Sequence, residues 1–183
     1  DGALLWQLKG GSNSSAAVAG NYAVVCTDKK DGGFAGYELS PAGGKELWRA
    51  PLADSFVSPI IQGDYAYATG KKQSLCVELK TGTVLWSAEL GTDECSSPVL
   101  ADGKLFNVRT GKKAGVVMAR ANAEKGEVLA SMFCPVLQYS SLSLNNGKLY
   151  VRSDRALLCY QLARDAAAEG GNGAKADIVD RAA

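Results

Sequence analysis

The 183-residue sequence predicts an all-β fold, a β-propeller of four-stranded antiparallel blades with four blades in this chain. A phrase of Gly, variable residues, Leu and Trp recurs, and its tryptophans Trp6, Trp48 and Trp86 lie about 40 residues apart, the length of one blade. Ala130 stands where a fourth tryptophan is expected. Between these positions, short runs of Val, Ile, Leu and Tyr are broken by Gly, Asn and Asp, which is typical of strands and turns.

Each repeat has the same internal order. A Ser-rich segment leads into the first strand, a two-residue turn containing Gly follows, and second and third strands come before a fourth that ends on the Leu-Trp phrase. Such turns supply the positive φ angles that tight hairpins require. The expected first strands are 14–19, 57–62, 96–101 and 140–145, and the expected third strands are 34–39, 74–79, 115–120 and 156–162.

The strand count leaves one strand over at each end of the chain. The fourth repeat stops after its third strand, whereas residues 2–8 (GALLWQL) read as a fourth strand with no blade of their own. Because an unpaired sheet edge is a liability, three arrangements follow: a closed four-bladed ring, half of an eight-bladed ring made by a homodimer through exchanged terminal strands, or part of a longer propeller. We expect blades over 1–165 and an Ala/Gly-rich C-terminal tail over 166–183.

Composition excludes several classes of function. Twenty Lys and Arg against nineteen Asp and Glu give a net charge of +1, which does not favour nucleic-acid binding. No apolar run is long enough for a transmembrane segment. The chain has no histidine, so Ser-His-Asp and Cys-His catalysis and His-ligated metals are excluded. Its five cysteines include no CxxC. We expect Cys76 and Cys159 to be buried in matching third strands, and a Cys95–Cys134 disulfide is left open.

Charged residues gather in loops that a propeller places on one face. The loops from fourth to first strands share that face with the loops from second to third strands, where pairs of cations recur. We refer to this end of the blades as the loop face, and it either attracts an acidic partner or carries lysines for solubility. The candidate binding residues are Lys29, Lys30, Asp54, Lys71, Lys72, Asp93, Glu94, Lys112, Lys113, Arg152 and Arg155.

The Trp phrase is predicted to be structural. A Gly-containing turn begins the outermost strand, and its Trp offers a large flat surface to the neighbouring blade. The residues expected to dock one blade on the next are Trp6, Trp48, Trp86, Gly44, Gly82 and Gly126.

The phrase VELKTGTVLW (77–86) resembles the docking motif of the quinoprotein-dehydrogenase-like propellers, the PQQ-like repeats, which reads Ala-x-Asp-x-x-Thr-Gly-x-x-x-Trp. Cys76 takes the Ala position and Glu78 the Asp position, while Thr81, Gly82 and Trp86 match. The other copies match less well, and the resemblance covers about residues 2–165. It implies the propeller fold, which by itself does not decide a function.

Within that family the resemblance implies two broad roles. Some members are dehydrogenases that bind pyrroloquinoline quinone (PQQ) and calcium in the central funnel, and others resemble an outer-membrane assembly lipoprotein. The dehydrogenases often carry adjacent cysteines, which this chain lacks. We therefore expect a non-catalytic binding scaffold, periplasmic or secreted, that presents its loop face to a protein or peptide and needs no cofactor. The alternative, part of a PQQ-dependent dehydrogenase with PQQ and calcium, stays open, and no catalytic, cofactor-binding or metal residue is assigned.

Overall fold

The computed structural model describes residues 1–8, 13–27, 33–52, 56–70, 72–92 and 96–162. These residues form four antiparallel sheets in which consecutive strands pair. The first blade contains β1 (Ala17–Ala19), β2 (Tyr22–Cys26), β3 (Phe34–Ser40) and β4 (Gly43–Ala50). The second contains β5 (Ile60–Gln62), β6 (Tyr65–Thr69), β7 (Ser74–Glu78) and β8 (Val84–Ala88). The third contains β9 (Val99–Ala101), β10 (Lys104–Arg109), β11 (Gly115–Arg120) and β12 (Val128–Phe133), with a 3-10 helix η2 (Gly111–Lys113) before β11. The fourth contains β13 (Ser143–Asn145), β14 (Lys148–Arg152) and β15 (Leu157–Gln161).

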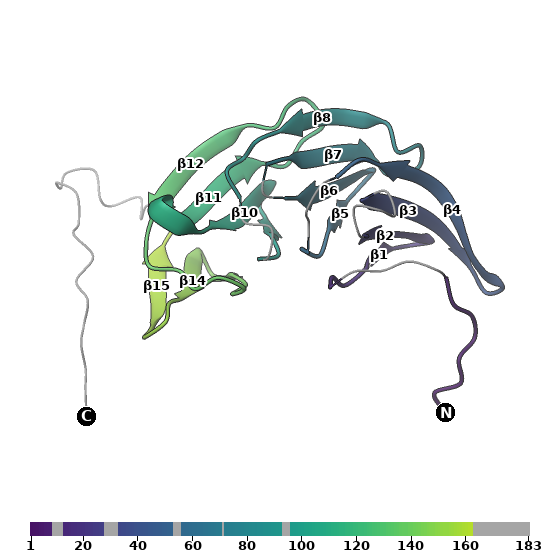
Figure 1. Ribbon diagram of the computed structural model, residues 1–183, viewed down its shortest axis with the longest axis horizontal. Coiled ribbons are helices and arrows are strands. Elements are labelled where there is room, and N and C mark those ends of the chain that lie inside the picture. The colour runs from purple at the N-terminus through teal and green to yellow at the C-terminus, as the bar shows by residue number, and fades with distance from the viewer. Residues whose placement is uncertain (9–12, 28–32, 53–55, 71, 93–95, 163–183) are drawn as a thin grey trace.

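The predicted fold class is confirmed, and the blades follow one another along an arc (Figure 1). The outermost strands β4, β8 and β12 lie along its convex edge, and residues 1–8 and β15 lie at opposite ends. The expectation that residues 2–8 complete the last blade is wrong for the single chain. Residues 1–8 contain no strand, and the described part of the fourth blade has three strands. The single chain is therefore an open arc rather than a closed four-bladed ring.

The innermost strands are three residues shorter at their start than the sequence predicts. The Ser-rich segments before them bond across blades instead of joining the strand ladder. The amide of Ser15 donates to Oγ of Ser58 at 3.1 Å, and the amide of Ser58 donates to Oγ of Ser97 at 3.0 Å. Pro59 and Pro98 have no amide hydrogen to give to a ladder. The serines thus connect the first three blades at their inner ends.

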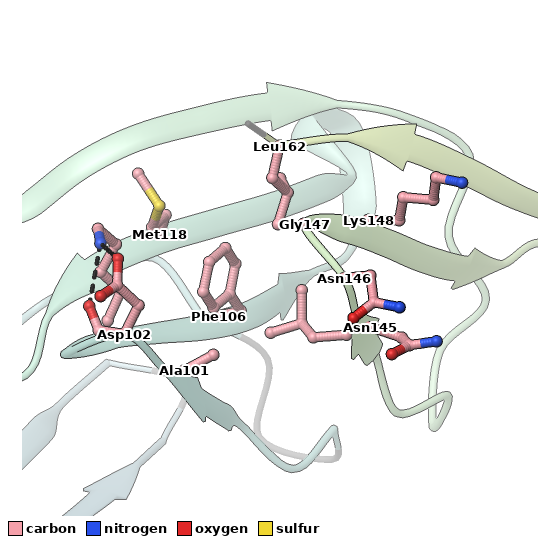
Figure 2. Close-up of a pocket in the computed structure, with 11 residues that line it drawn as sticks. Ala101, Asp102, Phe106, Met118, Asn145, Asn146, Gly147, Lys148 and Leu162 are labelled. Carbon is pink, nitrogen blue, oxygen red and sulfur yellow. Dashed lines mark hydrogen bonds and ion pairs between the residues drawn. The ribbon is translucent and has the colours of Figure 1, made fainter. Parts of the chain in front are cut away.

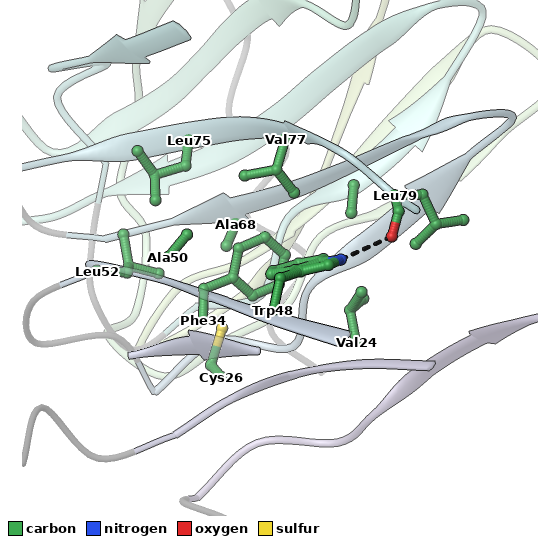
Figure 3. Packing of buried hydrophobic residues seen from close by; sticks show 11 residues of the cluster. Val24, Cys26, Phe34, Trp48, Ala50, Leu52, Ala68, Leu75, Val77 and Leu79 are labelled. Atoms are coloured by element: carbon green, nitrogen blue, oxygen red, sulfur yellow. Dashed lines mark hydrogen bonds between the residues drawn. The ribbon is translucent and has the colours of Figure 1, made fainter. Parts of the chain in front are cut away.

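The core lies between blades rather than within one sheet. Three clusters of buried apolar side chains join the first blade to the second, the second to the third and the third to the fourth. Between the first two blades, Phe34 meets Trp48 edge to face, with ring centroids 5.3 Å apart, and both rings pack against Leu75 and Val77 (Figure 3). Stability therefore depends on the contact surface between neighbouring blades, which we call a seam.

Candidate functional site

The loop face is held together by bonds between the two expected sets of loops. Thr92, which follows β8, donates its hydroxyl to the carbonyl of Gly70 between β6 and β7, at 2.8 Å. The amide of Leu137, which follows β12, donates to the carbonyl of Arg152 at 2.9 Å. The connections from fourth to first strands and from second to third strands therefore meet at the same end of the second, third and fourth blades.

The cations that the structure describes at the loop face are exposed and come from three consecutive blades: Lys72, Lys112, Lys113, Arg152 and Arg155. Asp154 lies 3.6 Å from Arg155 and partly neutralises it. The remaining candidate residues, Lys29, Lys30, Asp54, Lys71, Asp93 and Glu94, lie outside the described residues. The second, third and fourth blades thus each place at least one cation at this end.

The position of the Lys112–Lys113 pair is fixed by its surroundings. Both lysines lie in η2, and the guanidinium of Arg109 donates from Nε to the carbonyl of Lys113 at 2.6 Å. The same guanidinium lies 5.4 Å from the centre of the Phe133 ring, within the range of a cation–π contact. The turn that carries the pair is therefore tied to both β10 and β12.

At the first two seams, each tryptophan packs on a glycine of the next blade. Trp48 donates its indole hydrogen to the carbonyl of Leu79 at 2.7 Å (Figure 3), and a Cβ on Gly82 would lie only 2.3 Å from its Cγ. Trp86 donates to the carbonyl of Asn122 at 2.8 Å, and a Cβ on Gly126 would lie 2.9 Å from its Cε3.

The N-terminal member of the expected docking set differs. Trp6 is half-buried, and Leu8 occupies the space beside Gly44, where an added Cβ would lie 2.6 Å from Leu8 Cδ1. Residues 1–8 are not held in a sheet, so their side chains do not take the register that the two other tryptophans share.

The third seam contains a pocket that the sequence analysis did not predict. Its cavity of about 430 Å³ lies between the third and fourth blades and is lined by Phe106, Met118 and Leu162 and by the turns at Asp102 and Asn146 (Figure 2). A second hollow of about 250 Å³ shares those three lining residues and reaches Ala130. Ala130 in place of the repeated tryptophan was the signal in the sequence that could have located it.

The burial of each described cysteine depends on whether a neighbouring blade covers it. Cys76 is buried, as predicted, and burial raises the pKa of its thiol to about 11. Cys159 is exposed, so its predicted burial is wrong: no blade among the described residues covers its face of β15. Cys134 is buried with a free thiol whose pKa is raised by burial. Cys95, its candidate disulfide partner, lies outside the described residues.

Comparison with known sequences agrees with this architecture. The sequence model of the family described as "Outer membrane protein assembly factor BamB" matches residues 37–156, more than half of the chain. The chain belongs to the PQQ-like propeller family. No curated protein sequence matches it.

Several solved structures resemble this chain in fold. BamB from Moraxella catarrhalis aligns with a TM-score of 0.64 and 14% identity, over 82% of this chain and 50% of that chain. A europium-containing methanol dehydrogenase aligns with a TM-score of 0.57 and 14% identity, over 73% of this chain and 27% of that chain. The computationally designed Ika4 protein aligns with a TM-score of 0.64 and 11% identity, over 89% of this chain and 100% of that chain. This chain therefore spans half of the BamB structure and about a quarter of the dehydrogenase.

The dehydrogenase alternative would require a PQQ-like propeller to hold calcium through clustered carboxylate and amide oxygens. In the ranges that the structure describes, no three His, Cys, Asp or Glu side chains gather closely enough to hold a metal ion. We therefore assign no described residue to calcium or PQQ, and we derive no reaction step through them. In the same ranges, no helix is long and apolar enough to cross a membrane.

Proposed function

We propose that this chain is a non-catalytic binding propeller whose loop face receives an acidic segment of a protein partner. The observation that carries the proposal is the set of exposed cations that consecutive blades place at one end: Lys72, Lys112, Lys113, Arg152 and Arg155. Membership in a family described as an outer membrane protein assembly factor supports a role in protein binding and a location outside the cytoplasm, periplasmic or secreted.

The charge arrangement gives this proposal its physical basis. The net charge of the chain is only +1, so attraction depends on the local field of the loop face rather than on the total charge. Exposed charges interact over roughly 10 Å at 0.1 M salt. An acidic segment lying across two blades would meet cations from both blades, and its affinity should fall as salt is added.

The proposed role needs neither PQQ nor calcium. The dehydrogenase alternative makes a separate prediction, namely that added PQQ and calcium produce dye-linked oxidation of an alcohol. Such an activity, absent without the quinone, would replace the scaffold proposal.

The proposal can be tested with a fluorescein-labelled octaglutamate peptide and fluorescence anisotropy. We expect its affinity to fall by about tenfold between 50 and 200 mM NaCl, because the contact is made by exposed charges. The double variant Lys112→Glu/Lys113→Glu should bind at least about tenfold more weakly at 50 mM NaCl.

The matched control is Lys45→Glu/Lys80→Glu. It changes the net charge by the same amount, but both lysines are exposed at the opposite end of the blades, where β4 begins and β7 ends. An equal loss of binding in the two double variants would show that only total charge matters. Binding that does not respond to salt would also contradict the proposal.

A further inference from the structure

The strand register places three residues at one equivalent position of the first three blades. Trp48 pairs with Gly36, Trp86 pairs with Cys76, and Ala130 pairs with Met118. At the first two positions the indole fills the seam to the next blade and is buried, with 8% of each tryptophan exposed. At the third position a methyl group takes its place, and the pocket described above lies at that seam.

The lining of the pocket suits an aromatic ring. Phe106, which is 5% exposed, occupies the register position of Tyr67, the residue whose ring centroid lies 6.2 Å from that of Trp86. Met118 adds a thioether, and thioethers make favourable contacts with aromatic ring edges. Figure 2 shows Phe106 and Met118 on the third blade and Leu162 across the gap on the fourth. The larger hollow, of about 430 Å³, is within the size range of small-molecule sites, and the hollow that reaches Ala130 is about 250 Å³.

An acceptor for an indole hydrogen is available at the equivalent place. Leu79 follows β7, its amide donates to the carbonyl of Asp64, and its own carbonyl accepts the indole hydrogen of Trp48. Leu162 follows β15 in the same way, and its amide donates to the carbonyl of Gly147 at 2.7 Å. The carbonyl of Leu162 is therefore the counterpart of the one that receives an indole in the first seam.

We propose that the seam between the third and fourth blades binds a small planar aromatic molecule of the indole class. The ring lies between Phe106, Met118 and Leu162, and its N–H donates to a backbone carbonyl at the end of β15. The larger hollow is distinct from the loop face, because the turns at Asp102 and Asn146 that line it lie at the opposite end of the blades. The hollow is open to solvent, since Ala130 is exposed and Leu162 is 41% exposed, so a small aromatic molecule can reach it from the surface.

The test is a titration of the full chain with free indole, measured by isothermal titration calorimetry. For a ligand of this size we expect a dissociation constant on the order of 1 mM. At ten times that concentration the melting temperature should rise by about 3–6 °C. Ala130→Trp should weaken indole binding at least tenfold and raise the melting temperature without ligand, because its side chain takes the site.

Ala130→Phe is a second filling variant, with the same expected loss of indole binding, in case the larger ring does not fit. The control is Ala19→Trp, which adds an indole at an exposed alanine of β1 in the first blade and should bind indole as the wild type does. Absence of indole binding by the wild type, or unchanged binding by both filled variants, would overturn the proposal. Binding of an Ala-Trp-Ala peptide without binding of free indole would also overturn it, and would assign the pocket to a tryptophan side chain of a partner.

Discussion

The second and third seams of this propeller are packed by different residues at the same position of the outermost strand. Between the second and third blades, Trp86 stands opposite Cys76 and reaches the carbonyl of Asn122 in the next blade. Between the third and fourth blades, Ala130 stands opposite Met118 and a cavity remains. Bulk has moved from the outermost strand to the strand beside it, and Met118 only partly fills the space that an indole would take.

This difference shows what the repeated tryptophan contributes. The first seam, like the second, places a small residue opposite the tryptophan. Gly36 stands opposite Trp48, and a Cβ on Gly36 would lie 2.2 Å from Trp48 Cε2. Gly36 and Cys76 are small and stand opposite the two tryptophans, whereas the larger Met118 stands opposite Ala130. Because protein interiors are close-packed, the two strands compensate each other, and the pocket is the part that compensation leaves unfilled.

The largest expected effect comes from making the second seam resemble the third. Trp86→Ala should lower the free energy of unfolding by about 3–5 kcal/mol, because it removes a buried indole and leaves a cavity. Urea denaturation measures this change, and free indole should restore part of the lost stability. Trp6→Ala is the control: Trp6 is only half-buried, so we expect a loss of about 1 kcal/mol. Equal losses in the two variants would contradict the role given to the seam.

A smaller effect is expected from the glycine that receives the indole. Gly82 has a φ of +73° and Gly63 has a φ of +57°, but only Gly82 faces a tryptophan, whereas a Cβ at Gly63 would meet nothing within 4 Å. Both Gly→Ala substitutions incur the backbone strain of a positive φ. Gly82→Ala should cost about 1–3 kcal/mol more than Gly63→Ala in denaturation, because Trp48 must also move. Equal costs would mean that the indole does not need the glycine.

The smallest expected effect is a difference in reactivity between two cysteines, because no blade in the described part of the chain covers the face of β15 that carries Cys159. Cys76 faces the third blade, and its raised pKa of about 11 leaves roughly one thiolate in a thousand at pH 8. Cys159 takes the equivalent register position on β15 and is exposed. Iodoacetamide followed by peptide mass spectrometry should modify Cys159 at least tenfold faster than Cys76 at pH 8, and modification of Cys76 should rise with pH up to about 11. Protection of Cys159 would show that a second copy of the chain or another partner covers this face.

The sequence was a good guide to the blades and a poor one to their edges. The strand order and the paired turns follow from local patterns, and Asp102 and Asn146 do adopt the positive φ angles that their turns require. The exposure of Cys159 and the missing strand at residues 2–8 depend on whether a neighbouring blade is present, which a local pattern does not record. The sequence alone did not locate the pocket, because the effect of Ala130 depends on its pairing with Met118 and on the packing of the fourth blade against it.

The most direct test of the third seam uses the two methionines of the chain, Met118 and Met132, because both line the hollow beside Ala130. Protein labelled with carbon-13 at its methionine methyl groups gives two resonances, which Met132→Leu assigns. We expect free indole to shift the Met118 resonance in the wild type, through the ring current of a nearby aromatic ring, and to leave it unshifted in Ala130→Trp. Indole binding detected by calorimetry with neither methionine resonance displaced would place the ligand elsewhere and contradict the account.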